Sequence, residues 1–486
     1  MSSLDSIRDE RLRKLNTLKE KGIDPYPVES GLTHTLAQVS ADFDALVEAK
    51  KEVTVGGRVM ALRLLGGLAF ADIDDGSGAK IQAYFKKDDM DAAVFDLFVE
   101  VSDRGDFIAF TGPLTVTKRG ERSVLVSSWK MLAKSLLPLP DSWYGLEDKE
   151  LKLRERHLDF ILDPTLRALF VRKAAFWRAM RTFLEERGYL EVETPVLETT
   201  PGGADARPFV THHNALDIEA YLRISAGELW QKKLLVAGFP KVFEIGRIFR
   251  NEGISTEHLQ DYTQCEFYEA YGDYTKGMSM IRDMYREIAQ KVYGTQKFTI
   301  RGHEVDLAQE WEMVHFGDIL KKHFDIDPVT CTEKEAFAAA KKAGIELPDG
   351  SNKARATDLL WKSLRRSISG PAFLIGIPVS MEPLAKRVPG REEVERFQVL
   401  LAGSEMGKGF SELNNPLDQR ERFESQQAMR DAGDDEAQHM DEGYVKAMEY
   451  GMPPAFGFGV SERLFAFLED RSAHETQMFP LLRPKN

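Results

Sequence analysis

The sequence contains few cysteines, with Cys265 and Cys331 the only two among its 486 residues. So few thiols exclude a disulfide framework and a cysteine-rich zinc site. Long hydrophobic runs are missing too, and the first residues lack the apolar core of a signal peptide. We therefore expect a cytoplasmic protein that has no membrane partner.

An excess of basic residues is also missing, because 78 acidic residues outnumber 65 lysines and arginines and leave a net charge of -13. This balance argues against a uniformly basic nucleic-acid-binding protein. It leaves room for a local basic surface, since phosphate contacts depend on the lysines and arginines nearby. The length of the chain allows two or three domains.

The residue patterns predict four successive segments in an α+β protein. These are an N-terminal helical extension, a small β-barrel of short strands and tight turns, a proline-containing linker, and a large domain of strands and helices. A helical insertion rich in Ala, Lys and Glu interrupts the large domain and carries no evident chemistry. The expected bounds are residues 1–50, 51–135, 136–150 and 151–486, with the insertion at about 332–368.

Two residues of the expected barrel, Phe70 and Gln82, lie on facing strands of one hairpin, and Arg63 lies upstream. An exposed aromatic ring, an amide and a guanidinium can stack on, hydrogen-bond to and neutralise an unpaired base. The alternative is that Phe70 belongs to the barrel core and that Gln82 has no special role.

Residues 241–272, KVFEIGRIFRNEGISTEHLQDYTQCEFYEAYG, predict a strand, a charged loop and a returning strand. A period of two places several polar residues on one face of this hairpin. That face holds either a ligand or solvent, and the alternation alone leaves both open. The residues on it are Glu244, Gly246, Ile248 and Arg250 in the first strand, and Tyr262, Gln264, Glu266 and Tyr268 in the second.

The order Phe249-Arg250-x-Glu252, followed by His258 and Tyr262, resembles motif 2 of the class II aminoacyl-tRNA synthetases. Three further segments resemble the bacterial type of class II lysyl-tRNA synthetase, and the resemblance runs from about residue 10 to the C-terminus. These segments are PGGADARPFVTHHNALDIEAYLRIS, GSEMGKGFSELNNPLDQRERF and FPLLRP, at residues 201–225, 403–423 and 479–484.

The resemblance implies an N-terminal OB-fold β-barrel that binds the anticodon, and a class II catalytic domain built on an antiparallel sheet. It further implies a homodimer formed through the segment YLEVETPVL, which is similar to motif 1. The implied enzyme is an ATP-dependent ligase that uses Mg²⁺ and joins L-lysine to tRNA(Lys) through a lysyl-adenylate.

The resemblance also assigns roles to individual residues. Arg250 and Arg463 are the expected catalytic residues, and a planar guanidinium suits the negative charge that gathers on a phosphate. Buried carboxylates opposite the substrate ammonium would reject shorter or apolar amino acids, whose binding leaves a charge unpaired. The expected binding residues are Arg250, Glu252, His258, Tyr262 and Arg463 for ATP; Glu228, Glu266, Tyr268, Phe410 and Glu412 for lysine; Glu405 for the metal; and Arg63, Phe70 and Gln82 for the anticodon.

Three positions depart from the family pattern. Gln398 stands where the family usually has a second magnesium-binding glutamate, so the number of magnesium ions stays open. Lys408 replaces an asparagine, and we expect it to reach the ATP phosphates rather than to repel the lysine substrate. The stretch similar to motif 3 is one residue shorter than usual and has Glu462 in place of an aspartate.

Three other functions remain open at this point. An aspartyl- or asparaginyl-type synthetase shares the domain plan, but its pocket needs a cation or an amide where this chain offers carboxylates. A paralogue that attaches lysine to a protein lacks the barrel. Gln398 and Lys408 leave open a catalytically inactive paralogue that binds nucleic acid, although Arg250, Glu252 and Arg463 are retained.

Overall fold

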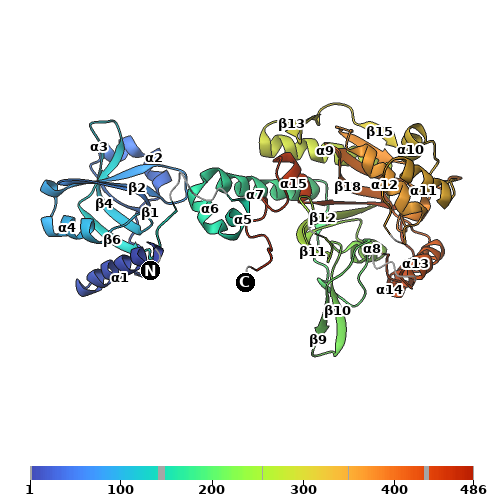
Figure 1. The fold of residues 1–486 in the computed structure, drawn as a ribbon, viewed down its shortest axis with the longest axis horizontal. Helices are drawn as coiled ribbons and strands as arrows, with labels where there is room; N and C mark the ends of the chain where they lie inside the picture. Colours follow the sequence, from blue (N-terminus) through green and yellow to red (C-terminus); the bar gives the residue numbers. More distant parts are fainter. Residues whose placement is uncertain (1–2, 141–147, 254, 349, 432–436, 485–486) are drawn as a thin grey trace. The chain divides into compact units, whose positions relative to one another are not determined.

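The computed structural model of the protein describes residues 3–140, 148–253, 255–348, 350–431 and 437–484. By their internal contacts the residues form two units, Met1–Pro164 and Thr165–Asn486 (Figure 1). The domain bounds expected from the sequence stay predictions. The contacts divide the chain after Pro164, so helices α5 (Lys149–Arg154) and α6 (Arg156–Leu162), at and after the end of the expected linker, belong to the first unit.

Six strands of the first unit form one sheet, in the order β1-β2-β3-β5-β4-β6. Pairing of β1 with β4 closes this sheet into a barrel, which is the expected OB-fold. The strands are β1 (Glu52–Leu65), β2 (Leu68–Asp74), β3 (Ile81–Lys86), β4 (Phe107–Val116), β5 (Arg122–Leu125) and β6 (Ser128–Ala133). The helical elements are α1 (Ser3–Glu20), α2 (Leu36–Ala41), α3 (Phe43–Glu48), η1 (Lys87–Asp89), α4 (Ala92–Val101), α5 (Lys149–Arg154) and α6 (Arg156–Leu162).

Aromatic rings fill the barrel where α4 closes it. Phe85 of β3 stacks on Phe98 of α4 with ring centroids 4.1 Å apart, and Phe110 of β4 meets Phe85 edge-on at 5.7 Å. Alternate residues of β2 and β3 are buried, so the residues between them, including Phe70 and Gln82, face outward. Phe70 is therefore not part of the barrel core.

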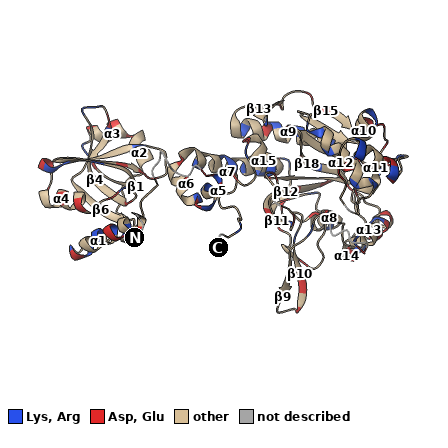
Figure 2. Ribbon diagram, in the orientation of Figure 1, with Lys and Arg blue, Asp and Glu red and all other residues tan. Residues whose placement is uncertain are grey.

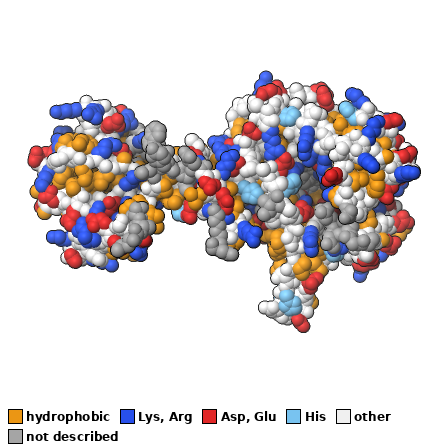
Figure 3. Space-filling model, viewed as in Figure 1, with side chains coloured by type: hydrophobic (Ala, Val, Ile, Leu, Met, Phe, Trp, Pro, Cys, Tyr) orange, Lys and Arg blue, Asp and Glu red, His pale blue; other side chains and the backbone are white. Residues whose placement is uncertain are grey.

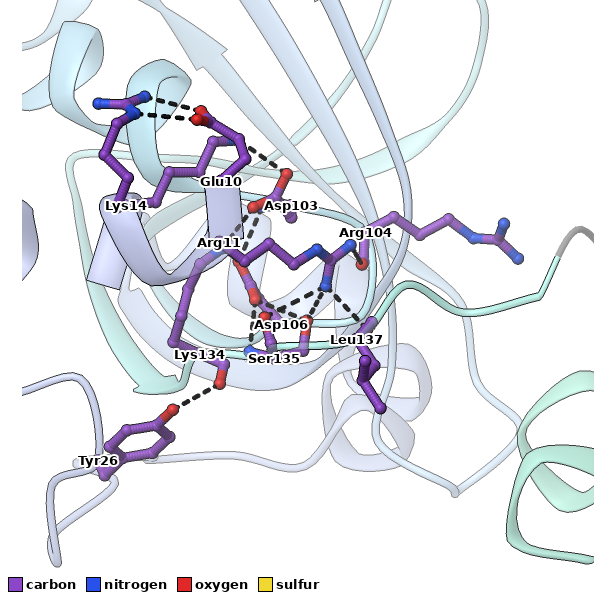
Figure 4. Close-up of polar contacts among 11 residues, drawn as sticks. Glu10, Arg11, Lys14, Tyr26, Asp103, Arg104, Asp106, Lys134, Ser135 and Leu137 are labelled. Atoms are coloured by element: carbon purple, nitrogen blue, oxygen red, sulfur yellow. Dashed lines mark hydrogen bonds and ion pairs between the residues drawn. The ribbon is translucent and has the colours of Figure 1, made fainter. Parts of the chain in front are cut away.

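A buried ionic network fixes helix α1 to the barrel (Figure 4). Lys134, the residue after β6, and Asp106 have fully buried side chains and pair at 2.8 Å. Asp103 accepts from Lys134 at 2.6 Å and from Lys14 of α1 at 2.8 Å, and Arg11 of α1 donates to backbone carbonyl groups at 2.9 and 3.0 Å. Because an unpaired charge is costly in such a place, this network sets the position of α1 on the barrel.

Charge is mixed rather than segregated on the surface. Basic and acidic residues alternate on α1 (Figure 2), and Figure 3 shows acidic and basic side chains interspersed over the visible face of each unit. None of the helices in the described ranges is both long and apolar enough to cross a membrane.

Eight strands of the second unit form its main sheet, in the order β15-β16-β17-β18-β19-β12-β11-β7. Neighbouring strands are antiparallel except for β15 with β16 and β11 with β7 at the two edges. Two smaller sheets have the orders β8-β10-β9 and β13-β14. The strands are β7 (Leu190–Glu191), β8 (Leu197–Glu198), β9 (Val210–His213), β10 (Ile218–Leu222), β11 (Lys241–Phe249), β12 (Asp261–Ala270), β13 (Lys297–Ile300), β14 (His303–Asp306), β15 (Glu312–His315), β16 (Ala372–Ile375), β17 (Arg396–Leu401), β18 (Ser404–Ser411) and β19 (Ala455–Ser461).

Helices cover both faces of this sheet. Helix α9 packs against β17, β18 and β19, where Phe397 and Phe458 stack with centroids 5.8 Å apart. Helix α8 packs against β11 and β12 on the face to which Tyr268 points. The helical elements are α7 (Pro164–Glu185), α8 (Glu228–Val236), α9 (Tyr274–Tyr293), α10 (Phe316–Phe324), α11 (Glu333–Lys342), α12 (Lys353–Arg365), η2 (Val379–Met381), α13 (Pro416–Asp431), α14 (Glu442–Met448) and α15 (Arg463–Leu468).

Candidate active site

A cavity of about 570 Å³ lies over β12, β18 and β19 and is bordered by α8 and α12. Its lining includes every residue that the sequence predicted for catalysis, lysine, ATP or metal binding, except Glu252. Glu252 lies exposed on the loop between β11 and β12, near Arg250. The cavity therefore brings together residues that are more than two hundred positions apart in the chain.

The acidic end of the cavity carries a buried cluster of charges. Glu228 opens α8, and Glu412 follows β18 with only 1% of its surface exposed. Between them lies Lys232, which is fully buried and whose Nζ is 2.7 Å from Glu228 and 2.5 Å from Glu412. Sequence reasoning missed this lysine, although its position one helical turn after Glu228 was a usable signal.

Glu266 and Tyr268 of β12 complete this end of the cavity. Glu266 accepts hydrogen bonds from the backbone N–H of Ala226 at 3.0 Å, from the Gln264 amide at 2.6 Å and from the Tyr268 hydroxyl at 3.1 Å. Burial and the neighbouring carboxylate of Glu228 raise the pKa of Glu266. Burial likewise raises the pKa of Glu412, against the opposing effect of Lys232.

A glycine allows Tyr268 and Glu412 to approach each other. A Cβ atom on Gly457 of β19 would lie 2.3 Å from both a carboxylate oxygen of Glu412 and a ring carbon of Tyr268. No such contact is tolerated in a folded protein, so the position admits only glycine in this arrangement.

The motif 2 side of the cavity is cationic. The Arg250 guanidinium donates to the backbone carbonyl of Ile224 at 3.2 Å and lies 5.9 Å from the Tyr262 ring centroid. Arg463, the first residue of α15, donates to the backbone carbonyl of Glu405, and its Nη1 lies 3.4 Å from His258. Burial and the nearby Arg463 lower the pKa of His258, which favours a neutral ring.

A second cationic cluster lies on β17 and β18. Gln398 and Lys408 are direct neighbours across these strands. Lys408 pairs with the buried Glu382 at 2.8 Å, and Arg396 pairs with the same carboxylate at 2.6 Å and also donates to Gln398. Two cations share one carboxylate, so this wall keeps a net positive charge, and Lys408 is its more exposed member.

Glu405, the expected metal ligand, offers one carboxylate that two residues of a single helix orient. The Glu405 carboxylate accepts from Trp361 Nε1 at 2.8 Å and lies 3.1 Å from Arg365, and both partners come from α12. Burial raises the pKa of Glu405, but Arg365 and Trp361 outweigh it and hold the pKa below its usual range. Mg²⁺ is commonly held by one or two carboxylates together with substrate phosphates. Within the described ranges no three His, Cys, Asp or Glu residues gather as a metal cage.

The two α12 contacts correct one expectation, because the helical insertion had been expected to carry no evident chemistry. Trp361 and Arg365 orient the expected metal ligand, and Asn352, Arg355 and Asp358 line the cavity.

The predicted anticodon residues gather on the outer face of the barrel. The Arg63 guanidinium donates twice to Asp72, at 2.9 and 3.0 Å, and the Gln82 amide donates to the same carboxylate at 3.1 Å. Phe70 stacks on Tyr84 with ring centroids 4.8 Å apart and planes within 3°. The face thus offers aromatic surface beside fixed polar groups, as an unpaired base requires.

Comparison with known proteins agrees with this geometry. The family described as class II tRNA synthetases (D, K and N) matches residues 148–483, and the OB-fold nucleic acid binding domain matches residues 53–132. The lysine–tRNA ligases of Roseiflexus castenholzii and Moorella thermoacetica are each 42% identical to the chain. The match with the Roseiflexus protein covers 99% of the chain and 99% of that relative, and the match with the Moorella protein covers 98% of the chain and 97% of that relative. The lysine–tRNA ligase of Nostoc punctiforme is also 42% identical, over 99% of the chain and 89% of the relative.

The chain belongs to the class II lysine–tRNA ligase family. This membership confirms the resemblance and the fold inferred from the sequence, including the pairing of an OB-fold with a class II catalytic domain. The aspartate, asparagine and inactive alternatives are not favoured, because these full-length relatives are all lysine–tRNA ligases. Lysine–tRNA ligases use ATP and Mg²⁺ generally. The roles of single residues in this member of the family stay predictions.

Proposed function

We propose that this protein attaches L-lysine to tRNA(Lys) in two steps. A carboxylate oxygen of lysine attacks the α-phosphorus of ATP, and pyrophosphate leaves to give lysyl-adenylate. A hydroxyl of the 3'-terminal ribose of tRNA then attacks the carbonyl carbon, and AMP leaves. The observation that carries this proposal is the single cavity in which buried carboxylates and half-buried arginines face a shared space.

The acidic end of the cavity would hold the amino acid. Glu412 and Tyr268 would receive the ε-ammonium, and Glu228 and Glu266 the α-ammonium, with the Phe410 ring along the aliphatic stem. Both ammonium groups would then face carboxylates in a site shielded from water, where a missing partner is costly. A shorter or neutral amino acid would leave one oxygen of Glu412 without a cationic partner.

The cationic side would hold ATP. Arg250 would bridge the lysine carboxylate and the α-phosphate, and Arg463 would bind the far end of the triphosphate. Glu252, His258 and Tyr262 would position the nucleotide. Because the attacking carboxylate is already ionised, this step requires orientation and charge stabilisation rather than a strong general base.

The metal would be held by Glu405, together with the phosphates. When bound, Mg²⁺ neutralises and orients the triphosphate. We propose that this site takes fewer ions than a pair of carboxylates would hold, because Gln398 offers no charge. Lys408 is well placed to supply a fixed positive charge to the phosphates instead, since Glu382 is shared with Arg396.

The remaining partners are part of the same proposal. The face with Arg63, Phe70 and Gln82 would read the anticodon of tRNA(Lys). Homodimerisation would bury the motif 1 segment, in which Leu190 and Leu197 are each about half exposed, at 50% and 51%. A tRNA ligase of this kind would act in the cytoplasm.

Pyrophosphate exchange tests the proposal directly. The enzyme is assayed with lysine, aspartate and asparagine side by side, and exchange is expected with lysine alone. The Glu412→Gln variant should lose most of its lysine-dependent exchange and keep its affinity for ATP. Exchange with aspartate or asparagine, or none with any of the three, would overturn the assignment.

A further inference from the structure

A lysine of the protein itself lies directly behind the acidic end of the cavity, where it pairs with two of the lining carboxylates. Lys232 projects from α8 and is fully buried. Its Nζ lies 5.1 Å from the Phe410 ring centroid and 5.7 Å from that of Tyr268, so it lies behind the residues that line the space proposed for the substrate. A buried ammonium beside a pocket for an ammonium substrate needs a physical explanation.

The two oxygens of Glu412 are in different situations. Oε2 lies 2.5 Å from the Nζ of Lys232. Neither oxygen makes a hydrogen bond of regular geometry within the described part of the chain, and Oε1 lies 2.3 Å from the place that a Cβ on Gly457 would occupy, at the cavity wall. Glu412 therefore has one oxygen paired within the protein and one left for a ligand.

The charges around this point balance only when a doubly charged ligand is present. Glu228, Glu266 and Glu412 with Lys232 carry a formal charge of -2 when all are ionised. Lysine brings two ammonium groups, so the loaded site would be neutral. Without Lys232 the same site would keep an unpaired negative charge in a buried place, which favours uptake of a proton by a carboxylate.

We propose that Lys232 is a positioning residue for amino-acid binding: a built-in counter-ion that holds one oxygen of Glu412, favours the ionised form of this carboxylate, and directs the other oxygen to the substrate ε-ammonium. The inference rests on the proposed function, because it assigns a role within the same lysine site. It makes Lys232 a determinant of lysine affinity rather than a group that reacts.

The charged and titratable groups around Lys232 come from four segments. Tyr444 of α14 is the most remote from the cavity, and its pKa is raised by burial, so it stays neutral in the working range. The groups are Glu228 on α8, Glu266 and Tyr268 on β12, Glu412 after β18, and Tyr444 on α14. Among these groups only the three carboxylates carry a negative charge that Lys232 can balance.

The test is the pH profile of kcat/KM for lysine in pyrophosphate exchange. Lys232→Met removes the charge and keeps much of the side-chain volume. Its profile is expected to move to higher pH by about one unit or more, with about a tenfold loss at pH 7 that shrinks as the pH rises. The KM for ATP should stay the same. Lys232→Arg keeps the charge, so its profile should keep the wild-type position even where its KM for lysine differs.

Lys233→Met is the matched control. Lys233 is the next residue of α8, lies over the Trp230 ring at 4.5 Å, and pairs with Asp441 at 3.8 Å. Its loss should leave the lysine profile in place. Circular dichroism checks that each variant is folded, and if Lys232→Met does not fold, the profile of Lys232→Arg decides.

Three results would overturn the inference: an unshifted profile for Lys232→Met, a shifted profile for Lys232→Arg, or tighter lysine binding by Lys232→Met at pH 7. Tighter binding by Lys232→Met would mean that Lys232 competes with the substrate ammonium for Glu412. Failure of the proposed function looks different, because the wild-type enzyme would then show no lysine-dependent exchange.

Discussion

At the scale of single residues, burial is the feature on which the proposed lysine pocket depends. A carboxylate at the surface is ionised at neutral pH, but Glu266 and Glu412 are both at least 97% removed from solvent by surface area, at 3% and 1% exposure. Burial raises the pKa of each, so the empty pocket holds protons that a surface carboxylate would have lost. Binding of a cationic substrate must displace those protons.

This proton exchange predicts the pH dependence of lysine binding. The pKa is raised to about 7 for Glu266 and to about 8 for Glu412. Both are needed as anions, so lysine affinity should increase as the pH rises from about 6 to about 9 and proton release should accompany binding. In the empty enzyme, the raised pKa values of these two carboxyls favour the folded state at low pH. This contribution to the free energy of unfolding is lost as the pH rises past the two pKa values.

Calorimetry of lysine binding in two buffers of different ionisation enthalpy measures the released protons. Thermal unfolding, with and without lysine, should show a stabilisation by lysine that grows over the same pH range. If the affinity for lysine did not depend on pH between about 6 and 9, Glu266 and Glu412 would not be the partners of the lysine ammonium groups.

Gly457 gives a steric prediction at the same scale. In Gly457→Ala the new methyl group would lie 2.3 Å from Glu412 and from Tyr268, so one of these side chains must move out of the proposed lysine-binding site. Overpacking of this kind costs about 1–3 kcal/mol, and we expect the KM for lysine to rise at least about tenfold while the KM for ATP stays unchanged.

Gly67→Ala is the control for this glycine, because its nearest neighbour would be an ordinary contact with Lys87 at 3.7 Å. Steady-state kinetics for both substrates, with circular dichroism of the folded state, separate the effects. Equal losses for lysine and ATP would indicate general damage instead of a blocked lysine seat.

The sequence predicted correctly which face of strand β12 borders the cavity. Period-two alternation put Gln264, Glu266 and Tyr268 on one side of β12, and the cavity lies there. The same pattern could not reveal Lys232, because a lysine on a helix is usually solvated and only tertiary packing buries this one against Glu412. The family resemblance supplied residue roles, not the contacts between them.

At the scale of elements, helix α12 is the part whose importance the sequence concealed. Its composition indicates only a stable helix, since Ala, Lys, Leu and Arg all favour one. In the fold it runs along the cavity, where Trp361 and Arg365 reach Glu405 on β18. The helical insertion therefore borders the proposed nucleotide site, and its contacts across forty or more residues of sequence could not be read from local patterns.

Trp361→Phe tests this role of α12. The change removes the N–H donor to Glu405 and keeps most of the packing, so the carboxylate loses one of the two groups that orient it. Loss of a group that orients a metal ligand commonly weakens metal binding by about tenfold or more, so the half-saturating Mg²⁺ concentration for pyrophosphate exchange should rise about tenfold. The KM for lysine should change little.

Trp311→Phe is the matched variant, because Trp311 is buried and its Nε1 donates to the backbone carbonyl of Leu307 at 3.1 Å, outside the cavity lining. Binding of Mn²⁺ in the presence of lysine and a non-hydrolysable ATP analogue, followed by electron paramagnetic resonance, gives a readout independent of turnover. A normal Mg²⁺ requirement in Trp361→Phe would mean that α12 has no part in metal binding.

At the scale of the whole molecule, chemistry and recognition are assigned to different units. The cavity is built entirely from residues of Thr165–Asn486, and the predicted anticodon face entirely from residues of Met1–Pro164. Each unit has its own hydrophobic core. Under the proposed function, adenylate formation should therefore depend on the second unit, and transfer to tRNA on both.

Phe70→Ala separates these two dependences. Phe70 is on the outer face of the barrel and stacks on Tyr84, so its loss removes aromatic surface without opening the core. Stacking of a base on an aromatic side chain is worth about 1–3 kcal/mol, which predicts a loss of about 5- to 150-fold in kcat/KM for tRNA(Lys). Pyrophosphate exchange, which needs no tRNA, should keep its wild-type rate.

Phe107→Ala on β4 is the control, since Phe107 is also partly exposed, at 36%, but lies against Arg58 outside the face of Arg63, Phe70 and Gln82. If both variants aminoacylate tRNA(Lys) like the wild type, the anticodon is not read on this face; if Phe70→Ala also loses exchange, the two units are not functionally separate.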